Sequence, residues 1–362
     1  MNLSDFPKVA SVSQRKAGNP RVLIVRLSAV GDCVQTMPLA CAVRAHWPDA
    51  HLTWVVEKGA APLVEACDAV DQVIVLPKRF ATSPSLLARL RRELRREPFH
   101  FTLDPQGLTK SGLVAWLSGA RRRIGFSRPA AREINPWLQT ELVASRARHR
   151  VPQYLELLRP LAIDSPQIRF GLTIPPGVEA KVAEFITQSG LHGGYVALNP
   201  GAGWDSKRWP IERYADVARH LATCGTPCVV TWGGAQERDW AETIVTQSRG
   251  AAVLAPPTSL LELAGLLQHA RIFVGSDTGP LHLAAALGTP CVALFGASSA
   301  VACGPYGSGH VTLQVAHDES AGRKRNGADS WAMRRITSDN VCAASELLLQ
   351  SQNPWAAKSA AA

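Results

Sequence analysis

Short apolar stretches recur along the chain and are separated by longer stretches in which apolar positions return every three or four residues. The short stretches are rich in Val, Ile and Leu and predict buried strands, whereas the longer ones predict amphipathic helices. In the first half, the predicted strands cover residues 21–27, 52–56, 73–76 and 99–103, and the predicted helices cover residues 31–44, 85–96 and 109–117. Strands and helices that alternate at this spacing predict a parallel sheet covered by helices.

A proline-rich region between residues 159 and 194 interrupts this alternation and predicts a domain boundary. A second alternating set follows it, with strands at 195–199, 227–232, near 253, 271–274 and 291–295, helices at 211–223, 237–247, 260–268 and 281–287, and a final amphipathic helix at 339–350. We therefore expect an α/β protein with five segments. These are a loose tail (1–20), a first sheet domain (21–165), a linker region (166–193), a second sheet domain (194–338) and a C-terminal helix and tail (339–362).

Composition supports a globular protein with two cores, because 46% of the 362 residues are hydrophobic and 19% are charged. The first 20 residues lack the apolar core of a secretory signal, and no run is long enough to span a membrane, so we expect a cytoplasmic protein. The eight cysteines include no C-x-x-C pair. Cys224 and Cys228 lie four residues apart, but no second Cys/His pair completes a zinc set. Most of the cysteines lie in apolar settings, so we expect buried free thiols in a reducing compartment.

The net charge of +10 indicates an anionic partner, which can be nucleic acid, a membrane surface or a phosphorylated substrate. The excess is local, since residues 78–150 hold 16 Lys/Arg against 5 Asp/Glu, a net of +11. This segment lacks the basic–aromatic alternation of single-strand binders, which disfavours nucleic acid. The candidate anion-binding residues are Arg89, Arg91, Arg92, Arg95, Arg96, Lys110, Arg121, Arg122 and Arg123.

The segment 275–283, Gly-Ser-Asp-Thr-Gly-Pro-Leu-His-Leu, follows a predicted strand and opens a predicted helix. Asp277 or Thr278 can cap this helix, Pro280 suits its first turn, and Gly279 lets a ligand approach the backbone. Free N–H groups at such a helix start form a seat for a phosphate. An ordinary strand-to-helix turn with a good cap is the alternative interpretation.

Three other segments place chemistry directly after predicted strands, where ligands bind in α/β sheets. Asp32, beside Gly31, can act as a general base, and Lys207 in the glycine-rich loop 199–210 can neutralise a leaving phosphate. Glu237, after the strand at 227–232, can accept hydrogen bonds from ribose hydroxyls. In the segment 275–283 described above, His282 can contact phosphates or a sugar hydroxyl. The alternatives are helix N-terminal carboxylates, an exposed basic loop and a core histidine.

The sequence contains no metal-binding carboxylate pair after a strand, no H-E-x-x-H motif and no G-x-S-x-G motif. It therefore indicates neither a metal nor a serine nucleophile.

Taken together, five segments in order resemble glycosyltransferase family 9, the ADP-heptose:lipopolysaccharide heptosyltransferases. The matching segments are residues 26–38, 104–111, 199–210, 232–237 and 275–284. Residues 104–111, Asp-Pro-Gln-Gly-Leu-Thr-Lys-Ser, are most similar to the heptosyltransferase I branch. The chain departs from the pattern at Ala202 and Gly203, where some heptosyltransferases have two threonines ahead of the lysine.

The resemblance implies a GT-B fold, in which two Rossmann-like domains face each other across a cleft and the final helix often packs on the first domain. It implies an inverting, metal-independent transfer of heptose from ADP-heptose to an acidic lipopolysaccharide inner-core acceptor of the Kdo–lipid A type. The implied protein is a monomer with no cofactor and no nucleic-acid partner. It works in the cytoplasm and contacts the inner face of the inner membrane peripherally.

The resemblance also assigns roles to residues. Asp32 would be the catalytic base, and Lys207 would stabilise the departing ADP. The implied donor-binding residues are Gly31, Glu237, Thr258, Asp277, Thr278, Gly279 and His282. The implied acceptor-binding residues are Lys110, Arg121, Arg122 and Arg123. The alternatives are a GT-B enzyme with another donor or surface-glycan acceptor, a nucleotide-sugar epimerase, and a non-catalytic nucleic-acid binder.

Overall fold

The structure is a computed structural model that describes residues 19–318 and 329–351. The chain divides into two compact units, unit 1 up to Thr173 and unit 2 from Ile174 onward. This division lies inside the expected linker region of residues 166–193. Most of the expected N-terminal tail and residues 352–362 of the expected C-terminal segment lie outside the described residues.

Unit 1 contains a six-stranded sheet in the order β3-β2-β1-β4-β5-β6, in which every neighbouring pair is parallel. The strands are β1 (Arg21–Val25), β2 (His51–Glu57), β3 (Gln72–Leu76), β4 (Phe101–Asp104), β5 (Arg122–Phe126) and β6 (Glu141–Val143). The helices are α1 (Val30–His46), α2 (Ala61–Glu65), α3 (Pro84–Leu94), α4 (Thr109–Leu117), α5 (Asn135–Leu138) and α6 (Arg150–Leu155). Short 3₁₀ helices are η1 (Phe80–Thr82) and η2 (Glu156–Leu161).

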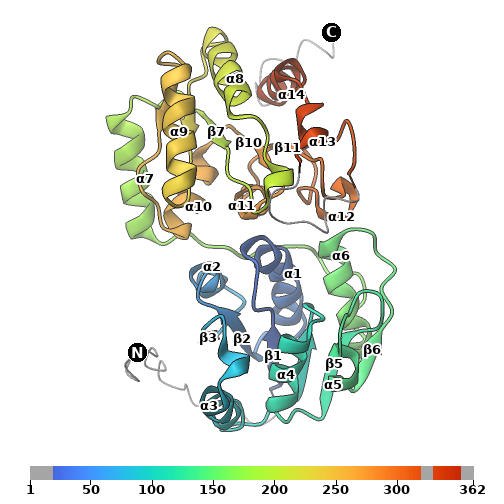
Figure 1. Ribbon diagram of the computed structural model, residues 1–362. Coiled ribbons are helices and arrows are strands. Elements are labelled where there is room, and N and C mark those ends of the chain that lie inside the picture. Colours follow the sequence, from blue (N-terminus) through green and yellow to red (C-terminus); the bar gives the residue numbers. More distant parts are fainter. Residues whose placement is uncertain (1–18, 319–328, 352–362) are drawn as a thin grey trace, which may run out of the picture. The chain divides into compact units, whose positions relative to one another are not determined.

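Unit 2 contains a second six-stranded parallel sheet in the order β12-β11-β10-β7-β8-β9. The strands are β7 (Val196–Asn199), β8 (Cys228–Val230), β9 (Ala252–Leu254), β10 (Ile272–Ser276), β11 (Cys291–Leu294) and β12 (Val311–Leu313). The helices are α7 (Pro176–Gln188), η3 (Asp205–Lys207), α8 (Ile211–Thr223), α9 (Ala235–Gln247), α10 (Leu260–His269), α11 (Gly279–Ala286), α12 (Ala300–Cys303), α13 (Trp331–Arg334) and α14 (Ser338–Ser351). Figure 1 labels most of these elements.

Both sheets have the strand order of the Rossmann fold, because the order of unit 2, counted from β7, repeats that of unit 1. This confirms the predicted α/β class with two Rossmann-like domains. The chain order reverses between β1 and β4 in unit 1 and between β7 and β10 in unit 2. The loops that leave such a strand pair diverge and open a crevice at the carboxyl ends of the strands. The topology therefore directs attention to the segments after these four strands.

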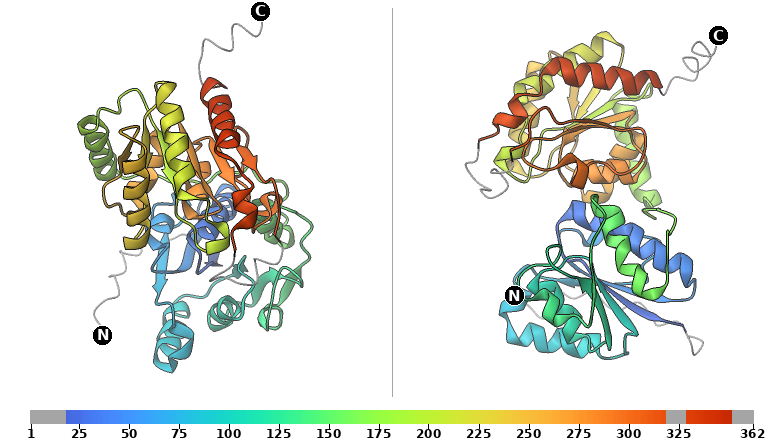
Figure 2. Two further views of the ribbon diagram at one scale, coloured as in Figure 1. Left: turned by 45° about the horizontal axis from the view of Figure 1, so that its top comes forward. Right: turned by 90° about the vertical axis from the view of Figure 1, so that its right-hand side faces the viewer.

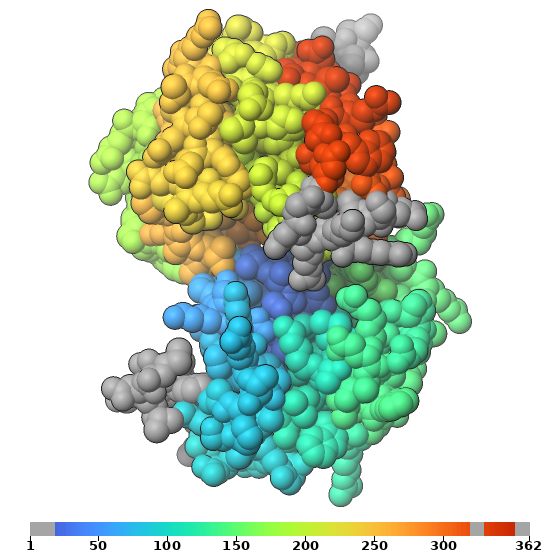
Figure 3. Space-filling model, in the orientation of Figure 1, coloured from blue at the N-terminus to red at the C-terminus, as the bar shows by residue number. Residues whose placement is uncertain are grey.

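The last helix differs from the expectation that it packs on the first domain. Val341, Leu348 and Leu349 of α14 belong to the apolar core of unit 2. The side chain of Arg271 donates to the carbonyl of Leu349 at 3.3 Å. α14 lies beside α8 in both views of Figure 2, and the space-filling view shows the red C-terminal segment against the yellow-green segment of α8 (Figure 3). The apolar face of α14 is thus buried within its own unit.

Within the described residues, no helix combines the length and the apolar character that crossing a membrane requires.

Candidate active site

Asp32 lies at the start of α1, directly after the carboxyl end of β1. Its Oδ1 is 2.6 Å from Nη2 of Arg26, and the hydroxyl of Tyr154 donates to the same oxygen at 3.4 Å. The backbone N–H of Ala29 donates to Oδ2 at 3.2 Å. The Asp32 side chain is nevertheless 39% exposed. The carboxylate is therefore oriented by three donors and remains accessible to a substrate hydroxyl.

Arg26 is the buried cation behind this carboxylate. Its Nη1 donates to the carbonyl of Pro105 at 3.0 Å, and the guanidinium lies 5.1 Å from the ring centre of Tyr154. Burial disfavours the charged guanidinium, but Tyr154 and Asp32 outweigh this, so that the pKa of Arg26 is raised. A permanent cation here favours the ionised form of Asp32, the form that accepts a proton. Sequence reasoning gave Arg26 and Tyr154 no role, although Arg26 directly follows β1.

Lys110 extends from the first turn of α4, which follows β4, toward the turn between β1 and α1. Its Nζ lies 2.7 Å from Oε1 of Glu57 and 3.2 Å from Oγ of Ser28. Glu57 is buried at the end of β2, whereas the Lys110 side chain is 32% exposed. The carboxyl edge of unit 1 therefore presents a cation beside the segment that carries Asp32.

The loop that leads into α4 is shaped by a buried carboxylate at Asp104. Burial raises the pKa of Asp104, and the hydrogen bonds that the carboxylate accepts oppose this shift. The donors are the backbone N–H groups of Gln106 and Gly107 and the side chains of Ser111, Asn135 and Gln139, at 2.6–3.1 Å. This network fixes the start of α4 and with it the position of Lys110.

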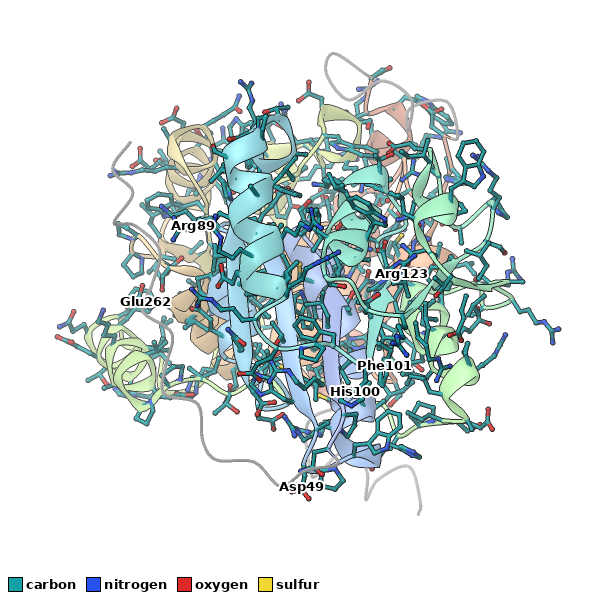
Figure 4. All side chains as sticks on the ribbon, turned by 90° about the horizontal axis from the view of Figure 1, so that it is seen from below. Asp49, Arg89, His100, Phe101, Arg123 and Glu262 are labelled. Carbon is teal, nitrogen blue, oxygen red and sulfur yellow. The ribbon has the colours of Figure 1, made fainter. Side chains whose placement is uncertain are left out.

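The other basic residues expected near the acceptor lie at the opposite edge of the sheet. Arg122 begins β5 and is paired in register with Phe101 at the amino end of β4. It forms an ion pair with Glu141, and the guanidinium of Arg123 donates to carbonyls of its own unit. Figure 4, which shows the molecule from below, labels Arg123, His100 and Phe101. The structure therefore does not bring Arg121, Arg122 and Arg123 together with Lys110.

In unit 2, Asp277 joins the segments that follow β7 and β10. Its Oδ2 lies 2.5 Å from Nζ of Lys207, and its Oδ1 lies 3.2 Å from Nε2 of His282. Lys207 also lies 4.6 Å from the ring centre of Trp204. The side chains of Lys207, Asp277 and His282 are 15%, 7% and 8% exposed. Asp277 therefore fixes a lysine and a histidine at one place rather than offering a free carboxylate.

The pKa of Asp277 reflects this arrangement. Burial alone would raise it, but the hydrogen bond from His282 and the charge of Lys207 prevail and hold the pKa of Asp277 well below its ordinary value of 3.8. Asp277 thus remains ionised, and its carboxylate keeps both partners in place.

An acid titration is expected to reveal this stabilisation. Because the folded-state pKa of Asp277 is depressed, its contribution to stability is fully present above pH 3.8 and is lost as the pH falls toward the folded-state value. The difference in unfolding free energy between the wild type and Asp277→Asn should therefore shrink below pH 3.8, as measured by urea unfolding at several pH values. A difference that stays constant down to pH 2 would show that the ionised form is not selectively stabilised.

The N-terminus of α11 lies directly beside this cluster. Thr278 is the N-cap residue, but no side chain caps the helix, and Oγ1 of Thr278 donates instead to the carbonyl of Ser276 at 3.2 Å. The predicted cap by Asp277 or Thr278 is therefore wrong, because both side chains have other partners. Gly279 and Pro280 form the first turn. Pro280 has no N–H, so the N–H groups that this helix start offers to an anion are those of Gly279 and Leu281.

Glu237 lies at a pocket of about 340 Å³ that begins at the loop after β7. Oε2 of Glu237 accepts from the N–H of Gly233 at 2.8 Å, and burial raises the pKa of this carboxyl. A Cβ at Gly201 would lie 2.6 Å from both oxygens of Glu237. The carboxylate therefore rests directly on the backbone of the Gly201 loop, which only glycine permits. The pocket is lined by Ala202, Gly203, Trp204, Asp205, Arg208, Gly233, Gly234, Ala235, Gln236, Glu237 and Trp240.

The remaining expected donor-binding residues are Gly31 and Thr258. Gly31 is buried in the first turn of α1, next to Asp32 in unit 1. Thr258 precedes α10 at the carboxyl edge of unit 2, half-buried, and does not line the pocket beside Glu237. The structure thus brings together Lys207, Asp277 and His282 with Thr278 and Gly279, and places Thr258 farther along the same edge.

Comparison with known proteins identifies the family. The model of glycosyltransferase family 9 (heptosyltransferase) matches residues 87–330, more than half of the chain. Lipopolysaccharide heptosyltransferase 1 of Pseudomonas aeruginosa is 30% identical over 302 residues, covering 81% of this chain and 83% of that protein. Lipopolysaccharide heptosyltransferase 1 of Escherichia coli K12 is 27% identical over 82% of this chain and 93% of that protein.

The structural matches agree with this result. The structure of E. coli heptosyltransferase WaaC with ADP has a TM-score of 0.73 and 25% identity, covering 91% of this chain and 99% of WaaC. A glycosyl transferase family 9 protein from Veillonella parvula has a TM-score of 0.79 at 22% identity, with 92% and 98% coverage. These matches confirm the GT-B fold class. The chain is a glycosyltransferase and belongs to family 9, the heptosyltransferase family.

Proposed function

We propose that this enzyme transfers heptose from ADP-heptose to an acidic inner-core acceptor of lipopolysaccharide, of the Kdo–lipid A type. The observation that carries the proposal is the cluster of Lys207, Asp277 and His282 beside the uncapped start of α11, which provides a seat for a diphosphate. The relatives support the choice of donor and acceptor, because they are named lipopolysaccharide heptosyltransferases. The WaaC structures contain ADP and ADP-2-deoxy-2-fluoro heptose.

The proposed reaction uses residues that follow the carboxyl ends of the strands in each of the two units. Asp32 accepts the proton of an acceptor hydroxyl, and the resulting oxygen attacks the anomeric carbon of the heptose from the face opposite the diphosphate. The bond between that carbon and the diphosphate oxygen breaks, and ADP leaves with the electron pair. A single displacement of this kind inverts the configuration at the anomeric carbon. The base belongs to unit 1 and the leaving-group site to unit 2.

The positive charge needed by the departing ADP comes from the protein itself. Lys207 supplies a cation, and the N–H groups at the start of α11 supply oriented donors. His282, whose Nε2 is hydrogen-bonded to Asp277, belongs to the same cluster, and we assign it a contact with a phosphate or a heptose hydroxyl. We therefore propose that the transfer requires no divalent metal. Asp277 acts as a positioning residue, since its own negative charge would repel a phosphate.

Lys110 is the residue that we assign to the acceptor. Its Nζ lies at the edge that carries Asp32, and it is accessible enough to meet a carboxylate of the acceptor sugar. Arg121, Arg122 and Arg123 lie at the far edge of the same sheet, so we assign them no part in binding the reacting sugar.

The contact between Gly201 and Glu237 leads to a prediction about donor binding. A Gly201→Ala substitution adds a methyl group 2.6 Å from the Glu237 oxygens and displaces this carboxylate from Gly233. If Glu237 binds the ribose hydroxyls, ADP affinity falls by about 10- to 100-fold, the usual effect of losing a hydrogen bond to a charged group. Calorimetric titration with ADP measures this effect.

Gly177→Ala is the matched control for this prediction, because Gly177 lies in α7, does not line this pocket, and a Cβ there meets no atom within 4 Å. Its ADP affinity should equal that of the wild type. Equal affinities in all three proteins would remove Glu237 from the donor site.

Product analysis tests the proposed function. Mass spectrometry of a Kdo–lipid A acceptor incubated with the enzyme and ADP-heptose should show the gain of one heptosyl group, and NMR should show inverted anomeric configuration. Gain of a sugar only from another nucleotide sugar would replace the proposed donor. A product with retained configuration would contradict the direct displacement by way of Asp32.

A further inference from the structure

The end of α8 carries, on one face, two side chains of types that can bind metals. His220 lies in the last turn of α8 and Cys224 is its C-cap residue, and a spacing of four residues places both on the same side of the helix. Glu346 of α14 faces them, and its carboxylate is hydrogen-bonded to the imidazole of His220. The ligand atoms of the three side chains all lie within 4.8 Å of one another. Three different ligand types thus converge from two helices.

The cluster is accessible to solvent, and the two helices that carry it are packed against each other. The side chains of His220 and Glu346 are 42% and 37% exposed, and Cys224 is exposed as well. Beneath them, α14 and α8 share the apolar core, and the hydroxyl of Ser338 at the start of α14 donates to Asp216 of α8 at 3.1 Å. Since α8 ends where the chain turns into β8, the cluster lies at the amino edge of the sheet. Lys207 lies in η3, before the other end of α8.

We propose that His220, Cys224 and Glu346 form a binding site for a zinc ion. A thiolate sulfur, an imidazole nitrogen and a carboxylate oxygen are the three ligand types that zinc takes in proteins, and water can complete a tetrahedral set. On binding, the Cys224 thiol releases its proton to solvent and its sulfur bonds to zinc, while neutral His220 binds through a ring nitrogen. The metal joins the C-terminal helix to α8 and replaces the hydrogen bond between His220 and Glu346.

The sequence conceals this site because its ligands are 126 residues apart at their widest. Cys224 and Cys228 are the pair that the sequence offers, but Cys228 is buried within β8. The third ligand comes from α14, which the fold of unit 2 brings alongside α8. No short spacing motif can therefore reveal the set.

A second group of metal-binding side chains in the described residues fits a cation less well. Cys41, Cys67 and Asp68 also lie within 4.8 Å of one another, but both thiols are buried. The carboxylate of Asp68 is already paired with Arg169, whose charge would repel a metal ion. Among the residues that the structure describes, no ion pair joins the α8–α14 cluster to a lysine or an arginine, and the cluster is open to solvent.

Zinc titration of the full-length protein tests the proposal. The protein is first stripped with EDTA and dialysed, and zinc chloride is then added in a calorimeter. We expect one zinc ion to bind per chain, and Cys224→Ser, His220→Ala or Glu346→Gln to weaken binding by more than the roughly 10- to 100-fold typical of outer-shell changes. Cobalt chloride should give a thiolate-to-cobalt absorption band that Cys224→Ser abolishes. Zinc at about 100 times its Kd should raise the melting temperature by about 5 °C.

His269→Ala is the matched control, because His269 and Glu179 form a similarly exposed pair at 2.9 Å that includes no cysteine. It should bind zinc like the wild type, as should Cys67→Ser. Absence of zinc binding in the wild type at micromolar concentrations would overturn the proposal. So would binding that survives Cys224→Ser or that Cys67→Ser abolishes. None of these readouts depends on transferase activity, so they are independent of the proposed function.

Discussion

Replacing Asp32 by Asn should lower kcat for heptosyl transfer by about 10²- to 10⁴-fold, the usual contribution of a general base. The amide has a similar size to the carboxylate and retains an oxygen that can accept from the N–H of Ala29. It cannot take the hydroxyl proton of the acceptor. ADP binding should be unchanged, because the leaving-group cluster lies in unit 2. ADP release at saturating donor and acceptor measures kcat, and calorimetry measures ADP affinity.

Asp49→Asn is the control for this variant, since Asp49 is an exposed carboxylate in the turn after α1, at the amino edge of the same sheet (Figure 4). It should keep wild-type kcat. The loss in Asp32→Asn must also exceed what unfolding explains, so both proteins are compared by urea denaturation. An Asp32→Asn enzyme with kcat within a few fold of the wild type would eliminate Asp32 as the base.

Replacing Lys207 by Met should damage both catalysis and stability. The lysine and Asp277 form a largely buried ion pair, and loss of the lysine leaves the buried Asp277 carboxylate without this cation. Such losses cost on the order of 3 kcal/mol of unfolding free energy. The departing ADP also loses its cation, so kcat should fall by about 10²- to 10³-fold.

The double variant Lys207→Met, Asp277→Asn separates the two effects. With both charges removed, no carboxylate is left buried without its lysine, and unfolding free energy should recover toward the wild type. Activity should remain low, because the charge that stabilises the leaving group is still absent. Recovery of kcat together with stability would show that Lys207 acts only as a structural partner of Asp277.

The central strands of both sheets could be predicted from the sequence because they are continuous apolar runs, such as residues 22–25 and 272–274. Three outer strands could not. β5 begins with Arg122 and Arg123, which indicate a charged surface rather than a strand. β6 and β12 have three residues each, one of them polar, whereas the equally short β8 and β9 are wholly apolar. Short outer strands depend on pairing with a neighbour, which no local pattern records.

The candidate site was likewise predictable only in part. Asp32, Lys207, Asp277 and His282 could be singled out because each directly follows a predicted strand, and parallel strands bring their carboxyl ends to one edge. Their mutual contacts could not be foreseen, because Asp277 is 70 residues from Lys207 along the chain.

The Arg26–Asp32–Tyr154 contact escaped prediction for the same reason, with 122 residues between Asp32 and Tyr154. In the sequence, Arg121, Arg122 and Arg123 could not be distinguished from Lys110, because only their positive charge was known. Only the strand register places them at the other edge of the sheet.

The most direct test of the proposed transfer is the release of ADP from ADP-heptose, without added divalent metal, in the presence and absence of a Kdo–lipid A acceptor. The proposed mechanism predicts release that requires the acceptor and that is nearly lost in Asp32→Asn. Release that proceeds equally without acceptor, or that is absent in the wild type with both substrates present, would contradict it.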